Sequence, residues 1–164
     1  MKRQAKGSEV STRVDLNAGR IYRTADIQDL SMLVFPSRNA TDLRVAFILI
    51  WATILESREG KVTSDELDFK RRELAPEISQ KTLWKTRAVM SRLGMIVLRD
   101  MEYWQFSGRW AGSLDSLAKK SDSMMTKPAT RDQMKKVWTL LNYSKALLKE
   151  RKRPRPLQAE APSD

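Results

Sequence analysis

The chain contains neither cysteine nor histidine among its 164 residues. Without Cys there are no disulfides and no thiol nucleophiles, and without either residue the usual ligands of structural zinc and the commonest general base are missing. The longest apolar run, residues 45–55, is shorter than the roughly 20 residues that a membrane-spanning helix needs. The absence of Cys and His excludes most enzyme mechanisms, so we expect that the protein is not an enzyme.

Two further absences concern reactive sites and targeting. The sequence has no Gly-rich loop that could cradle a phosphate and no Ser in a Gly-rich nucleophile turn. Asp65, Glu66 and Asp68 fall at the start of a predicted helix, where the helix dipole accounts for them better than a metal ion does. Residues 1–10 are polar and basic, so we expect no signal peptide and a soluble cytoplasmic protein.

What the sequence does contain is positive charge. Lys and Arg number 31 against 20 Asp and Glu, which gives a formal net charge of +11. Such an excess favours polyanionic partners through counterion release, with nucleic acid first and an anionic membrane surface second. With 41% hydrophobic residues, the chain also has material for one compact domain of roughly 100–130 residues plus tails.

Two helices are predicted ahead of the most basic stretch. The first is predicted over residues 39–57, which open with a polar cap at Thr41 and Asp42 and are then apolar nearly all round, as is typical of a central core helix. Residues 63–67 supply an N-cap and first-turn acids for a second helix, which Pro76 ends. Only three or four residues then connect it to the next helix. That connection length is the signature of a helix-turn-helix.

The basic helix is predicted over residues 79–93. Ser79 can cap its start, and Gly94 can adopt the left-handed conformation that ends it. At about 100° per residue, two opposite faces form. The core face holds Leu83, Thr86, Met90 and Leu93, and the other holds Lys81, Lys85, Ala88 and Arg92. Together with Arg87 there are four basic residues and no acid, which suits the outer face to an anion.

A hairpin is predicted after the basic helix, because residues 95–99 and 103–107 are rich in β-branched, apolar or aromatic residues and residues 100–102 can turn. The order of core helix, second helix, tight turn, basic helix, Gly and hairpin over residues 41–108 resembles the winged helix-turn-helix superfamily of DNA-binding proteins. The spacing of Leu83, Met90, Leu93, Gly94, Met95 and Ile96 is similar to the end of its recognition helix and its first wing strand. The resemblance implies a mainly α fold with a small antiparallel hairpin, and a basic helix that enters the major groove.

The predicted DNA contacts follow from this arrangement, with positions 81, 82, 85 and 92 facing the groove. The full set is Ser79, Gln80, Lys81, Thr82, Trp84, Lys85, Arg87, Arg92, Arg99 and Arg109. Trp84 either touches a thymine methyl or a sugar, or packs at the domain edge. Because the wing tip carries the acids Asp100 and Glu102, we expect Arg99 and Arg109 to contact phosphate in place of the tip.

The remaining segments flank a domain predicted over residues 20–108. Residues 1–19 have no periodicity and predict a basic flexible arm, which either reaches a minor groove or is a solvated tail. Residues 21–23 permit a short strand, whereas residues 27–34 have helical spacing. Residues 109–129 are polar and Ser-rich, and they predict a linker or a strap over the core with at most a short helix.

A last helix is predicted over residues 130–150, where Thr130 and Gln133 form a capping box. Its apolar stripe consists of Met134, Val137, Trp138, Leu141, Leu147 and Leu148. The stripe either packs on the same domain or pairs with a second subunit. We favour a homodimer, because helix-turn-helix proteins often dimerise to reach successive major grooves about 34 Å apart. Residues 151–164 predict a basic, Pro-containing disordered tail.

The main hypothesis is a sequence-specific double-stranded DNA-binding protein, a transcriptional regulator associated with the nucleoid. One alternative keeps the fold and makes the protein a replication or partition protein of a plasmid or other mobile element, which would bind repeated sites. Another is a protein-interaction subunit that does not bind DNA. We expect no cofactor, metal ion, small-molecule ligand or membrane among the partners.

Overall fold

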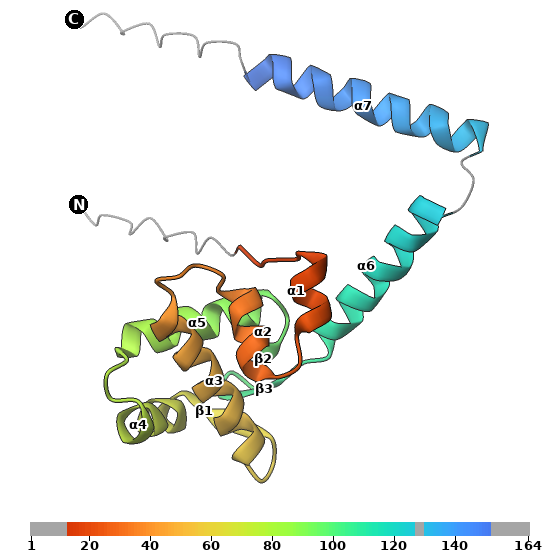
Figure 1. Ribbon diagram of the computed structural model, residues 1–164. Coiled ribbons are helices and arrows are strands. Elements are labelled where there is room, and N and C mark those ends of the chain that lie inside the picture. The colour runs from red at the N-terminus through yellow and green to blue at the C-terminus, as the bar shows by residue number, and fades with distance from the viewer. Residues whose placement is uncertain (1–12, 127–129, 152–164) are drawn as a thin grey trace, which may run out of the picture. The chain divides into compact units, whose positions relative to one another are not determined.

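A computed structural model describes residues 13–126 and 130–151 (Figure 1). The elements are α1 (Ala18–Arg23), α2 (Ile27–Val34), α3 (Thr41–Glu56), β1 (Lys61–Thr63), α4 (Ser64–Leu74), α5 (Gln80–Arg92), β2 (Ile96–Arg99), β3 (Tyr103–Phe106), α6 (Arg109–Thr126) and α7 (Arg131–Arg151). The chain divides into two compact units, the first ending at Asp115 and the second beginning at Ser116. The predicted combination of a mainly helical chain and a small antiparallel β element is confirmed.

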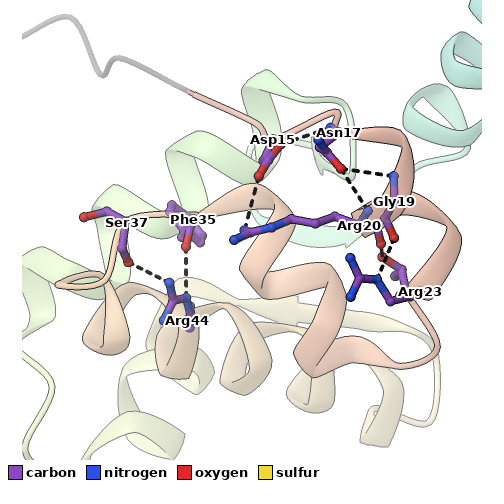
Figure 2. Close-up of polar contacts among 9 residues, drawn as sticks. Asp15, Asn17, Gly19, Arg20, Arg23, Phe35, Ser37 and Arg44 are labelled. Atoms are coloured by element: carbon purple, nitrogen blue, oxygen red, sulfur yellow. Dashed lines mark hydrogen bonds and ion pairs between the residues drawn. The ribbon is translucent and has the colours of Figure 1, made fainter.

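The first helix occupies a stretch for which the sequence also permitted a strand. Asn17 caps α1, because its side-chain Oδ1 accepts hydrogen bonds from the N–H groups of Gly19 at 3.0 Å and Arg20 at 3.3 Å (Figure 2). A side-chain oxygen at this position satisfies backbone donors that a helix start leaves free. The strand alternative for residues 21–23 is therefore wrong.

Polar contacts also fasten the residues that precede α1. The Asp15 N–H donates to the carbonyl of Leu33 at 2.8 Å. Figure 2 shows the Asp15 carboxylate beside the Arg20 guanidinium, at a distance of 3.2 Å. The arm predicted over residues 1–19 therefore ends earlier than expected, since the chain is attached by residue 15. The first twelve residues of that arm lie outside the described residues.

Helix α3 is the centre of the first unit, as predicted. Ala46, Phe47, Ile50 and Ile54 are fully buried, and α3 packs against α2, α4, α5, β1 and β3. The Phe47 ring stacks on Trp51 at a centroid distance of 5.8 Å. A helix that is apolar nearly all round can be buried on several sides at once, and these five elements cover it.

The start of α3 differs from the predicted cap. Thr41 is already helical, and the N-cap position belongs to Ala40, which makes no side-chain hydrogen bond. A long side chain fastens this end in its place. Arg44 donates from Nε to the carbonyl of Phe35 at 2.9 Å and from Nη2 to the carbonyl of Ser37 at 2.6 Å, which closes the turn between α2 and α3 (Figure 2).

The three strands form one antiparallel sheet in the order β1-β3-β2. Trp104 of β3 stands opposite Val62 on one side and Leu98 on the other. Trp104 is buried, and Phe106, two residues on, packs on Trp51 at 4.6 Å. The predicted hairpin is confirmed. The sequence did not reveal β1, because three residues are too few to show strand alternation.

Helix α6 corrects the linker or strap predicted over residues 109–129, since it is a continuous helix of 18 residues. Trp110, Leu114, Leu117 and Met124 recur at helical spacing, and Trp110 packs against the core of the first unit. The Ser and charged residues between them are exposed or half-buried, and Leu117 and Met124 are themselves exposed. Polar composition alone was therefore a poor indicator of a linker.

The second unit contains α7, whose predicted start is confirmed. Thr130 Oγ1 accepts from the Gln133 N–H at 3.3 Å, and Gln133 Oε1 accepts from the Thr130 N–H at 3.0 Å. Every residue from 131 to 150 is exposed. The basic tail predicted over residues 151–164 lies, apart from its first residue, outside the described residues. In the part of the chain that the structure covers, no helix has both the length and the hydrophobicity to cross a membrane.

Candidate nucleic-acid interface

The interface predicted from the sequence begins with α4, whose position is fixed by its cap. Thr63 Oγ1 accepts from the Glu66 N–H at 3.1 Å, while Glu66 Oε2 accepts from the Thr63 N–H at 2.6 Å. This reciprocal pair satisfies two free backbone donors and starts the helix directly after β1. Helix α4 then packs on both α3 and α5.

The turn between α4 and α5 is held by a charge that the sequence did not single out. Arg71 donates from Nε to Asp68 Oδ1 and from Nη1 to the carbonyl of Ile78, both at 2.8 Å. The Arg71 and Asp68 side chains are only 13% and 16% exposed. Ala75 and Ile78 of the turn are buried. Because charge-assisted bonds are short and directional, Arg71 fixes the angle at which α5 leaves the turn.

The start of α5 has the cap predicted for it. Ser79 Oγ accepts from the Thr82 N–H at 3.1 Å and lies 3.0 Å from Thr82 Oγ1. These two hydroxyl groups thus contact each other, and the Thr82 side chain is half-buried. Ser79 and Thr82, both predicted DNA contacts, primarily shape the end of the helix that would approach DNA.

The two faces of α5 separate as the helical spacing predicted. Leu83, Thr86, Val89 and Met90 are buried against the rest of the unit. The Thr86 hydroxyl is satisfied there, because it donates to the carbonyl of Thr82 at 2.9 Å. The opposite face is exposed and consists of Gln80, Lys81, Lys85, Ala88 and Arg92. No acid occurs within α5, and the small Ala88 lets a ligand approach its backbone.

The end of α5 brings a further cation to the same region. Gly94 has a φ of +79°, and the Met95 N–H donates to the carbonyl of Met90 at 2.9 Å, which confirms the predicted left-handed termination. The Trp110 N–H donates to the carbonyl of Gly94 at 3.1 Å. The exposed Arg109 at the start of α6 therefore lies beside the end of α5.

Arg87 is also placed by its neighbours, and it lies between two indole rings. The guanidinium carbon is 4.2 Å from the ring centroid of Trp84 and 4.6 Å from that of Trp104. Arg87 Nη1 donates to Ser64 Oγ at 2.7 Å, and Trp104 Nε1 donates to the same oxygen at 3.3 Å. Burial lowers the pKa of the Arg87 guanidinium, which still stays charged at neutral pH.

The β2–β3 hairpin ends in a tight turn with acidic flanks. Asp100 and Met101 have φ values of 52° and 59°, and the Glu102 N–H donates to the carbonyl of Arg99 at 3.0 Å. Arg99 is exposed at the end of β2, opposite Tyr103 of β3. The Glu102 carboxylate hydrogen-bonds to the Tyr103 phenol and raises its pKa, and its charge adds to the shift.

The predicted site residues thus fall into two groups. Those with exposed side chains on α5, β2 and α6 are Gln80, Lys81, Lys85, Arg92, Arg99 and Arg109. Those engaged in building the site are Ser79, Thr82, Trp84 and Arg87. Sequence reasoning missed the supports Ser64, Arg71 and Trp104, because their partners are distant in the chain or are backbone carbonyls. Comparison of the chain with protein-family models, curated proteins and solved structures finds no match.

Proposed function

We propose that the protein is a sequence-specific double-stranded DNA-binding protein, a transcriptional regulator, whose first unit is a winged helix-turn-helix domain. The order α3, β1, α4, α5, β2, β3 and the strand order β1-β3-β2 support that fold. The short turn after α4 corresponds to the turn of the motif, α5 to its recognition helix and the hairpin β2–β3 to its wing.

One observation carries the proposal, namely the asymmetry of α5. Its inner face is buried, while its outer face presents Lys81, Lys85 and Arg92 to the exterior without an acid in the helix. Lys and Arg donate to guanine edges and to phosphates, and Gln80 can pair with adenine. The major groove of B-DNA is wide enough to admit an α-helix. Helix α5 therefore has both the shape and the charge for groove binding.

The homodimer is part of the same proposal. The apolar stripe of α7 consists of Met134, Val137, Trp138, Leu141, Leu147 and Leu148, all exposed by 38% or more. We propose that the α7 helix of a second copy covers it. A regulator with two recognition helices would then bind a palindrome whose half-sites lie about one helical turn apart.

The test is selection of bound duplexes from a random-sequence library, with the full chain as bait. We expect enrichment of one motif, and we expect the affinity for that motif to fall steeply between about 50 and 200 mM salt. The double variant Lys81→Glu with Lys85→Glu should abolish selection. Its control, Arg58→Glu with Lys61→Glu, reverses two exposed charges in the turn after α3 and at β1, and it should retain selection.

The arrangement of the enriched sites decides between roles. A single palindrome supports a regulator, whereas iterated direct repeats indicate a replication or partition protein. If the wild-type chain enriches no motif, or if both double variants lose binding equally, the assignment of α5 as a recognition helix is wrong. Loss of binding in the control would show that total charge alone drives attachment to DNA.

A further inference from the structure

The contacts of Arg87 join three separate parts of the proposed DNA-binding site. Arg87 belongs to α5, Trp104 to the wing strand β3, and Ser64 is the first residue of α4. The Arg87 guanidinium contacts Trp104 and Ser64, and it also lies against Trp84 of its own helix. A single cation therefore connects the recognition helix, the wing and the start of the helix before the turn.

The combination of these contacts depends on a property that arginine has and lysine lacks. The guanidinium is planar, so its flat faces can lie against aromatic rings, and its N–H donors point outward in its plane. The Ser64 oxygen has two lone pairs, which match the two donors it receives from Arg87 and Trp104. Removing Arg87 would leave Trp104 without the cation against which its ring packs.

On these grounds we infer that Arg87 is a positioning residue, which sets the wing against the recognition helix and thereby determines DNA specificity without itself contacting DNA. The inference rests on the proposed function. Trp84, one turn before Arg87, is held in the same cluster and so kept from the exposed face formed by Lys81, Lys85 and Ala88. A shifted wing or a released Trp84 would change which base edges that face can reach.

The first experiment tests the packing in the free protein. The chain has five Trp residues, and each gives one indole N–H signal in a proton–nitrogen correlation spectrum. In Arg87→Met, which keeps an unbranched apolar stem but removes the plane and the charge, the Trp104 signal should shift while the Trp138 signal stays. Lys85→Met is the matched control, since it removes a charge from the exposed face of the same helix and should leave the Trp104 signal in place.

The second experiment tests the effect on DNA. Affinities of Arg87→Met are compared for the selected duplex and for a random-sequence duplex of equal length. We expect the ratio of the two affinities, which measures the preference for the selected duplex, to fall about tenfold because the cation–π contacts that fix the geometry are lost. The slope of log affinity against log salt should stay that of the wild type. Lys85→Met should reduce that slope by about one, as a lost phosphate contact does. Arg87→Lys should resemble Arg87→Met.

Several outcomes would overturn the inference. If Arg87→Met reduces the slope of log affinity against log salt by about one and keeps the preference for the selected duplex, Arg87 is a phosphate contact. An unmoved Trp104 signal would show that Arg87 does not hold the wing, and an unchanged preference would show that its packing has no part in specificity. If the wild-type chain itself prefers no duplex, the proposed function fails, whereas retained preference in Arg87→Met alone overturns only this inference.

Discussion

Tyr103 and Glu102 form a phenol–carboxylate pair at the β2–β3 hairpin, and the ionisation of the phenol can be followed directly. The hydrogen bond to Glu102 and the negative charge of that carboxylate both favour the protonated phenol, so the pKa of Tyr103 lies above its ordinary value of about 10. In the unfolded chain the hydrogen bond is no longer held in place, and the phenol ionises at a lower pH than in the folded chain. The contribution of the pair to stability is therefore present below about pH 10 and is lost as the pH rises through the folded-state pKa.

We expect Glu102→Ala to lower the pKa of Tyr103, because it removes both the hydrogen bond and the charge. The measurement is an absorbance titration of phenolate, with Tyr103→Phe used to identify the Tyr103 step. Glu59→Ala is the control, since Glu59 contributes only through its more weakly acting charge and should move the same step less. Coincident titration curves for wild type and Glu102→Ala would contradict the pairing.

Arg87 shows what a helical projection of the sequence can and cannot predict for one residue. The projection correctly separated the exposed positions Lys81 and Lys85 from the buried Leu83 and Met90. Arg87 lies at the boundary between the two faces, where spacing does not specify a direction. The direction follows from Trp104 and Ser64, which are brought to it by the strand order and by the start of α4.

At the scale of elements, the two ends of α5 were better predicted than the length of α6. Ser79 and Gly94 were identifiable because capping depends on one residue type at one position, and the structure confirms both. The length of helix α6 was not predicted, because its apolar residues are separated by Ser and charged residues, and this composition resembles that of a linker. Strand β1 was missed because it exists only through pairing with β3, a contact that local sequence does not encode.

The termination of α5 gives a test with an internal control. Gly60 and Gly94 have φ values of +66° and +79°, so Ala at either position is strained. At Gly60 an added Cβ meets nothing within 4 Å, whereas at Gly94 it lies 3.1 Å from the Cβ of Arg109. We expect Gly60→Ala to cost about 1 kcal/mol and Gly94→Ala about 2–3 kcal/mol in free energy of unfolding.

Urea denaturation of the two Gly variants measures this difference. The excess loss in Gly94→Ala reports the packing of the α6 start on the end of α5, because backbone strain is common to both sites. Equal losses in the two variants would mean that Arg109 moves aside without cost. That result would in turn weaken the placement of Arg109 beside the proposed DNA-binding helix.

At the scale of the whole molecule, positive charge acts on the two proposed interactions in opposite ways. DNA binding gains from the net charge of +11, because each neutralised phosphate releases counterions. Pairing of two α7 helices is opposed by charge, because helical spacing places Lys145 and Lys149 within or beside the apolar stripe, where they would approach the second copy. Salt screens this repulsion. Added salt should therefore weaken DNA binding and strengthen self-association.

The prediction for α7 is a salt-strengthened dimer that depends on its apolar stripe. The 21 residues of α7 span about 30 Å, and the free energy falls when a second copy removes the exposed apolar side chains along that length from water.

Leu141→Glu, which places a charge within the stripe, should give a monomer by sedimentation equilibrium or light scattering. Thr139→Glu is the matched control, because it adds the same charge on the other face of the helix and should leave the dimer intact. A wild-type chain that stays monomeric at high salt would contradict the pairing, and so would equal dissociation in both variants, since charge anywhere on α7 would then be sufficient.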